Sequence, residues 1–202
     1  SSDGLTLTAR DERGHTLSME RLLAICCRYE FLMGRDVAVS FSAPLLLDTM
    51  AERMGRKVYR YLNCPADEWD KEGRILASKV RFSRDGIALA IKLLDVLAAQ
   101  NTTLSQANEA MEPFEVYKQE ISLQENTGRF LQRVGQTLEG ARVEGEGVLY
   151  KTRDGSLLLC PFKNGRGLRV FTEARSMEAA KGLSEDLLDQ LGLAKQQPPQ
   201  DA

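Results

Sequence analysis

Residues 37–61, VAVSFSAPLLLDTMAERMGRKVYRY, decide the fold class of this chain. The apolar run at 36–40 is typical of a strand buried in a parallel sheet. Residues 43–55 repeat apolar side chains at helical spacing and end at Gly55, and 57–61 reads as another strand. Two strands joined through a helix by short loops form a parallel pair with a right-handed crossover. The stretch therefore predicts a layered α/β domain.

The flanking segments extend this domain. Residues 5–9 alternate like a strand, and 17–34 carry apolar residues at helical spacing. Residues 85–101 predict a further helix with Asp85 as its N-cap, because an aspartate there accepts hydrogen bonds from free backbone N–H groups. One stripe of that helix is expected to be Ile87, Ala90, Ile91, Leu94 and Leu97.

The chain changes character near residue 101. The pattern beyond it predicts a strand at 115–123, a helix at 127–138, strands at 141–152, 156–162 and 167–173, and a final helix at 177–191. Ser176 is the expected cap of the last helix, whose buried stripe is Ala180, Leu183, Leu187 and Leu191. Strands joined by tight turns favour an antiparallel α+β domain.

The predicted fold class is thus α/β plus α+β. A three-layer α/β/α domain at 1–104 is followed by a smaller domain of antiparallel sheet and helices at 105–193. Residues 194–202, which are polar and proline-containing, are expected to be a disordered tail.

Composition narrows the functional classes. The 202 residues carry a formal net charge of -2 and no apolar run of membrane-spanning length, so neither nucleic acid nor a membrane is an expected partner. The four cysteines, Cys26, Cys27, Cys64 and Cys160, have no metal-ligand spacing, which favours a reduced, cytoplasmic setting. His15 is the only histidine, which disfavours mechanisms that need two. No catalytic residue is assigned.

Residues 154–183, DGSLLLCPFKNGRGLRVFTEARSMEAAKGL, place a loop with two cations between two strands. The candidate phosphate ligands in and after this loop are Lys163, Asn164, Arg166 and Arg169. Backbone N–H groups and arginine side chains both suit anions. A solvated basic hairpin tip is the alternative, and it is the favoured interpretation.

Four stretches together resemble the C-terminal half of the α-D-phosphohexomutases, the phosphomannomutase/phosphoglucomutase family. They are 1–14, 37–61, 84–98 and 154–183, and they follow the family's order. The resemblance implies the family's third and fourth domains, with residues 1–14 as the end of the second domain and its metal loop. It also implies an isomerase that moves a phosphoryl group within a hexose through a phosphoserine, with Mg²⁺ bound.

The chemistry of the family's motifs is mostly replaced here. The three metal-loop aspartates correspond to Ser1, Asp3 and Leu5, so Asp3 is only a remnant, and neither a metal nor another cofactor is expected. The sugar-recognition motif G-E-x-S-G-H is missing from 67–84, where Glu72-Gly73 is a loose match. The motif R-P-S-G-T-E-P becomes the run from Cys160 to Arg166, while Arg169 matches the arginine of the following strand.

Three functions remain open. The first is a non-catalytic module, a pseudoenzyme with a structural or regulatory role in a larger protein of sugar-phosphate or sugar-nucleotide metabolism, such as a fusion to a sugar nucleotidyltransferase. The alternative is a fragment of a divergent hexose-phosphate mutase whose phosphoserine domain lies outside this chain. A weak sugar-phosphate sensor is a third option. The expected partners are other domains of a longer parent chain or a second copy, with weak sugar-phosphate binding. The chain alone is not expected to be active.

Overall fold

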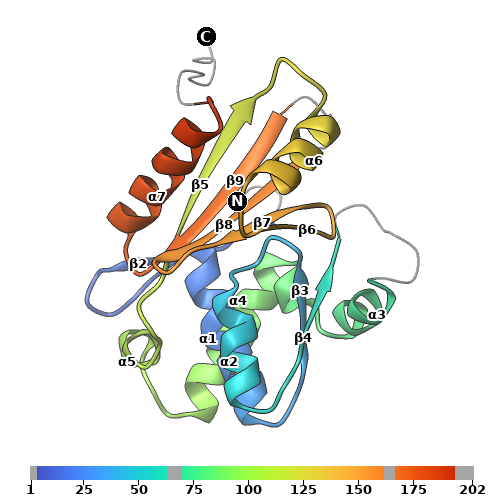
Figure 1. Cartoon of the computed structure of the whole chain (residues 1–202). Coiled ribbons are helices and arrows are strands. Elements are labelled where there is room, and N and C mark those ends of the chain that lie inside the picture. Colours follow the sequence, from blue (N-terminus) through green and yellow to red (C-terminus); the bar gives the residue numbers. More distant parts are fainter. Residues whose placement is uncertain (1–3, 63–69, 162–166, 194–202) are drawn as a thin grey trace. The chain divides into compact units, whose positions relative to one another are not determined.

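The computed structural model describes residues 4–62, 70–161 and 167–193 (Figure 1). The chain folds as two compact units that divide between Glu112 and Pro113. This division lies later in the chain than the boundary expected after residue 104, because helix α5 (Leu104–Glu109) belongs with the first unit. Within the described ranges, no helix combines the length and apolarity needed to span a bilayer.

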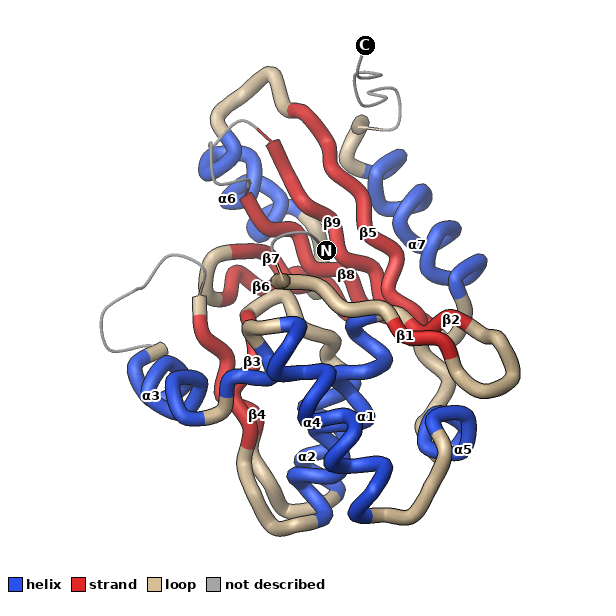
Figure 2. The backbone as a smooth tube through the Cα atoms, turned by 180° about the vertical axis from the view of Figure 1, so that it is seen from behind, coloured by secondary structure: helices blue, strands red, loops and turns tan. Residues whose placement is uncertain are grey.

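The first unit is built around a parallel strand pair. Its elements besides α5 are β1 (Ala9–Arg10), β2 (Thr16–Leu17), α1 (Met19–Leu32), β3 (Val37–Ser40), α2 (Leu46–Arg53), β4 (Val58–Tyr61), α3 (Lys71–Lys79), a 3₁₀ turn (Arg81–Ser83) and α4 (Gly86–Ala99). Strands β3 and β4 run parallel, with Val37 opposite Val58. Helix α3 lies on one side of the pair, and α1, α2 and α4 lie on the other (Figures 1 and 2). The predicted three-layer α/β/α arrangement is confirmed.

Local signals in the sequence set the ends of these helices. Ser18 accepts a hydrogen bond from the Arg21 N–H at the start of α1. Asp85 accepts from the N–H groups of Ile87 and Ala88, which confirms it as the cap of α4.

A largely buried arginine joins β4 to the turn that follows β3. The Arg60 guanidinium, whose side chain is 10% exposed, donates to the carbonyl oxygens of Phe41 at 2.9 Å, Ala43 at 2.8 Å and Pro44 at 3.0 Å. It also forms an ion pair with Asp48 on α2. Carbonyl groups that strand pairing leaves open are thereby satisfied, which holds the start of α2 against the sheet.

The second unit is a five-stranded antiparallel sheet with two helices. Its elements are β5 (Glu115–Ser122), α6 (Thr127–Thr137), β6 (Ala141–Glu144), β7 (Gly147–Lys151), β8 (Gly155–Pro161), β9 (Gly167–Ala174) and α7 (Met177–Gln190), with strand order β5-β9-β8-β7-β6. The predicted antiparallel α+β domain is confirmed. The segment 141–152 forms two strands rather than one, because the chain turns at Gly145, where φ is +54°.

One face of this sheet carries the core of the second unit. Alternate strand residues such as Leu159, Leu168 and Val170 pack with Phe130 of α6 and Leu187 of α7. The predicted cap of α7 is confirmed, since Ser176 accepts from the Ala179 N–H. The predicted stripe of α7 is confirmed as well, and its members are buried or half-buried: Ala180, Leu183, Leu187 and Leu191.

The prediction of a strand at 5–9 is wrong. Only Ala9 and Arg10 form a strand, which pairs with β2, while the Gly4 carbonyl oxygen accepts from the Gly86 N–H at 2.8 Å. Residues 4–6 therefore lie against the start of α4, and the apolar-polar alternation of this segment does not reflect sheet pairing. Helices α3 and α5 were not expected, because each is short and largely polar.

The expected stripe of α4 faces outward in the first unit. Ile87, Ile91 and Leu94 are 65%, 65% and 67% exposed, whereas Leu89 is 0% exposed and Leu93 is also buried. Helix α4 is apolar on more than one side, so its spacing allows either stripe to be buried. Packing against α1 and the 3₁₀ turn selects the stripe of Leu89 and Leu93.

Two alanine substitutions in α4 should separate these stripes. We expect Leu89→Ala to lower the free energy of unfolding by about 2–5 kcal/mol, since it leaves a cavity in the core. Ile91→Ala removes an exposed side chain and should change it by no more than about 0.5 kcal/mol. Urea unfolding of both variants measures the difference. Equal losses would mean that Ile91 is buried in the folded chain.

Candidate functional site

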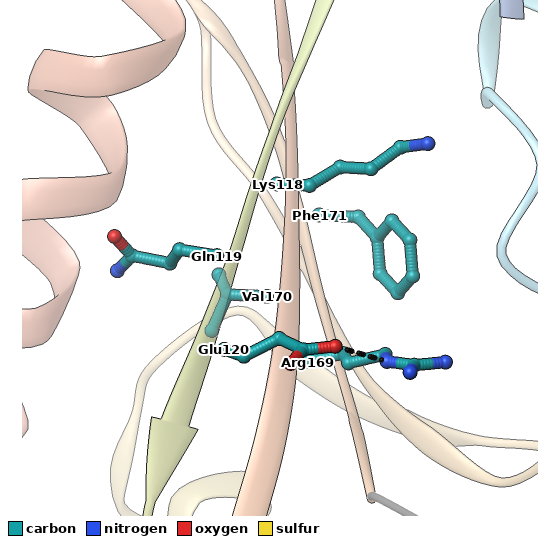
Figure 3. A pocket seen from close by; sticks show the side chains of 6 residues that line it. All are labelled: Lys118, Gln119, Glu120, Arg169, Val170 and Phe171. Carbon is teal, nitrogen blue, oxygen red and sulfur yellow. Dashed lines mark hydrogen bonds and ion pairs between the residues drawn. The ribbon is translucent and has the colours of Figure 1, made fainter. Parts of the chain in front are cut away.

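Arg169 is the one predicted phosphate ligand within the described residues. It lies on β9 between the core residues Leu168 and Val170, so its side chain points to the opposite face of the sheet. There its Nε donates to Oε1 of Glu120 on β5 at 2.8 Å. These two residues help line a hollow of about 420 Å³ along β5 and β9, together with Lys118 and Phe171 (Figure 3).

Within this hollow, Glu120 balances the charge of Arg169. The pair of Arg169 and Glu120 is 51% and 57% exposed, and ion pairs in such positions are worth only about 0–1 kcal/mol. A phosphate could therefore compete with Glu120, but it would meet that carboxylate at close range. None of the six described residues that line the hollow carries a hydroxyl group. The arrangement gives weak, unspecific attraction for an anion.

The other predicted ligands, Lys163, Asn164 and Arg166, lie outside the described residues. The strands that lead into and out of their loop are adjacent and antiparallel, with Pro161 opposite Leu168. Cys160, which stands where the family has an arginine, is buried. Burial raises the pKa of its thiol to about 12, and the nearby Arg169 lowers that pKa to a lesser extent. A neutral, buried thiol cannot replace an arginine as a phosphate ligand.

The residues matched to the metal loop do not fit Mg²⁺. Asp3 lies outside the described residues, and Leu5 presents an exposed aliphatic side chain. Mg²⁺ requires hard oxygen ligands in nearly octahedral geometry, and leucine supplies none.

The retained part of that motif, residues 11–14, closes a turn. The buried carboxylate of Asp11 accepts from the N–H groups of Arg13 at 3.0 Å and His15 at 2.8 Å. Glu12 accepts from the N–H and the hydroxyl of Ser105, near the start of α5. These hydrogen bonds give Asp11 and Glu12 structural roles, which are enough to explain why the fold needs them.

The segment matched to the sugar-recognition loop also has a structural role. Glu72 and Gly73 lie within α3, and a Cβ atom on Gly73 would stand 3.1 Å from the carbonyl oxygen of Arg60. Glycine therefore lets α3 approach β4 closely. Asp70 is buried, accepts from the Leu62 N–H at 3.0 Å and pairs with Arg74 at 3.1 Å. Asp70 thus serves the packing of α3.

A second hollow, of about 530 Å³, lies beside α3 and was not predicted. At its border the buried Glu30 pairs with Lys92 at 2.6 Å and with Arg35 at 3.2 Å. Burial alone would lower the pKa of Lys92, but the hydrogen bonds and charges of Glu30 and Asp95 together outweigh burial and raise that pKa. Glu30 lies on the buried stripe of α1, and a carboxylate at such a position indicates that cationic partners lie nearby. Asp95 pairs with Lys92 as well, at 3.4 Å, so two carboxylates balance two cations and the cluster joins α1 to α4.

We expect Glu12 to contribute to stability in a pH-dependent way. Its hydrogen bonds to Ser105 and Thr103 lower its pKa from 4.5 to about 2. A lowered pKa stabilises the fold above pH 4.5, and this contribution disappears as the pH falls toward 2. Glu12→Gln should therefore lower the melting temperature at pH 6 and leave it unchanged near pH 2. The exposed Glu52→Gln serves as the control, and a pH-independent loss in Glu12→Gln would contradict the prediction.

The described cysteines should be unreactive in the folded chain. Cys26, Cys27 and Cys160 are buried, and burial raises the pKa of Cys26 to about 12 and that of Cys27 well above its usual value. The thiolate is the nucleophile, so iodoacetamide at pH 8 should label none of the three until guanidinium unfolds the chain. Peptide mass spectrometry measures each site separately. Rapid labelling of Cys160 in the native protein would show that this strand opens.

No family model matches the sequence, and no curated protein matches it either. The fold is similar to a phosphoglucomutase/phosphomannomutase family protein from Burkholderia thailandensis, with a TM-score of 0.65 and 15% identity over 99% of this chain and 46% of that one. An N-acetylglucosamine-phosphate mutase of the α-D-phosphohexomutase superfamily matches with a TM-score of 0.50 and 9% identity, over 91% of this chain and 46% of that one. The chain thus spans about half the length of these proteins. The expected resemblance is confirmed for the fold: this chain has the fold of part of an α-D-phosphohexomutase.

Proposed function

We propose that this chain is a non-catalytic phosphohexomutase-like module with a structural or regulatory role in a larger protein of sugar-phosphate or sugar-nucleotide metabolism. The proposal rests on a contrast between two groups of residues in the stretches that resemble the family: those with structural roles and those that would bind a ligand. Asp11, Glu12, Gly73 and Asp85, which the chain retains, have hydrogen-bonding or packing roles. Among the positions that would bind a metal or a phosphate, Leu5 and Cys160 lack the side chain that binding requires, and Glu120 neutralises Arg169.

The parent protein of such a module would supply the chemistry. A fusion to a sugar nucleotidyltransferase in the cytoplasm suits this reading, because a sugar phosphate is the substrate that both kinds of domain handle. Within that protein, the module would act through its surfaces: it would hold other domains in place or assemble copies of the chain.

The alternative is a divergent hexose-phosphate mutase whose phosphoserine domain lies outside this chain. It is favoured by Arg169 alone, which keeps the matched position on β9 and has Lys118 nearby. In that case the second unit should retain affinity for a sugar phosphate, because phosphate contacts of this half would not depend on the phosphoserine.

Calorimetric titration with glucose 1-phosphate, mannose 1-phosphate and glucose 1,6-bisphosphate, with and without Mg²⁺, tests the proposal. We expect no binding up to millimolar concentration and no effect of Mg²⁺, since Glu120 balances Arg169 and the matched metal positions include Leu5. Micromolar binding that Arg169→Ala abolishes would overturn the proposal in favour of the mutase or a sensor. Arg133→Ala, which removes another exposed arginine of the same unit from its pair with Glu125, is the matched control.

A further inference from the structure

Strand β5 is an edge of the sheet in the second unit. Among the described strands it pairs only with β9, through a continuous eight-residue register from Glu115 to Ser122 (Figure 1). In an antiparallel ladder, about half of the backbone N–H and C=O groups of an edge strand point away from its only neighbour. Such a row of donors and acceptors can pair with another extended strand.

The side chains of β5 separate cleanly between the two faces. Tyr117 and Ile121 lie on the face that α7 covers, where Ile121 belongs to the core and the Lys181 ammonium lies 5.8 Å from the Tyr117 ring. Lys118 and Glu120 are exposed on the other face, beside Phe171 and Arg169 (Figure 3). The exposed face of the edge thus carries one cation and one anion, two residues apart.

This spacing is self-complementary in one antiparallel register. A two-fold axis perpendicular to the sheet keeps each face on its own side, so the axis can pass through Lys118, Gln119 or Glu120 near the middle of the strand. Axes at Lys118 or Glu120 bring like charges directly opposite each other. An axis at Gln119 places Lys118 opposite the second copy's Glu120, twice by symmetry, and Tyr117 opposite the second copy's Ile121.

The neighbouring strand strengthens this choice of register. Glu120 already pairs with Arg169 on β9, opposite it in the ladder. In the register centred on Gln119, Glu120 would lie between Arg169 of its own chain and Lys118 of the second copy, so that charges alternate across the joined strands. Opposite charges that face each other across strands are stabilising, and like charges are destabilising.

We propose that β5 is a homodimer interface, in which two copies of the chain pair antiparallel about Gln119 and join their sheets into one. A lysine on an edge strand usually discourages such pairing. Here Lys118 finds a partner in Glu120 of the second copy, in this register and not in the adjacent ones. The proposal does not depend on the non-catalytic role, since strand pairing needs only the backbone edge and the side chains of β5.

A single cysteine at the two-fold axis tests the register. In Gln119→Cys the two cysteines would stand directly opposite each other, with their Cα atoms about 4.5–5.5 Å apart. A disulfide requires a Cα separation of about 4.4–6.8 Å. Mild oxidation should convert this variant into a covalent dimer linked through residue 119, identified by peptide mass spectrometry. The parent chain and Val143→Cys, an exposed cysteine on the opposite edge strand β6, should give no such product. A failure of Gln119→Cys to cross-link would overturn the register.

Charge reversal tests the interface without cross-linking. Sedimentation of the full chain should show a dimer that Lys118→Glu weakens by roughly tenfold or more in Kd, since two attractive pairs become repulsive. The triple variant Lys118→Glu, Glu120→Lys and Arg169→Glu restores opposite charges on both sides of residue 120 and should recover the dimer. Circular dichroism should show all variants folded. A monomer at every concentration would overturn the proposal. A dimer that is lost in Ile91→Glu but kept in Lys118→Glu would do the same, because it would place the interface on α4.

Discussion

The first unit depends on a backbone approach that only glycine permits. The Gly86 N–H donates to the Gly4 carbonyl oxygen at 2.8 Å, and a Cβ atom on Gly86 would stand 2.8 Å from that same oxygen. Any larger residue would have to push α4 away from residues 4–6. Asp85 caps α4 at the same point, so two adjacent residues fix both the start of the helix and the path of the chain beside it.

The same reasoning applies to two residues in the stretches that resemble the family. Gly155 would place a Cβ atom 2.2 Å from the Glu173 carbonyl oxygen, and Asp11 holds two backbone N–H groups in a tight turn. The fold offers no substitute for either residue. Leu5, which is matched to an aspartate of the metal loop, has an exposed side chain, so the residue type at this position matters little for packing. Resemblance to an enzyme family is therefore strongest where the fold, rather than the chemistry, needs the residue.

Local patterns predicted most of the fold and little of its polar interior. Caps such as Ser176 and strands such as β3 are readable because their physics is confined to a few neighbouring residues. The buried stripe of α4 could not be chosen, since α4 is apolar on several sides and only packing decides between them. Arg60 and the pair of Glu30 with Lys92 join segments distant in sequence, and charged residues give no sign of burial by themselves.

The candidate phosphate site shows the same limit most clearly. A loop with two cations between strands predicts attraction for an anion, but the charge that an anion would meet also depends on the neighbouring strand. Glu120 is 49 residues from Arg169 in the chain, and the register of β5 on β9 places them opposite each other. Had the register shifted by two residues, Arg169 would face Lys118 or Ser122 and keep its charge available. Anion binding at this edge is thus decided by strand pairing, which the motif alone does not encode.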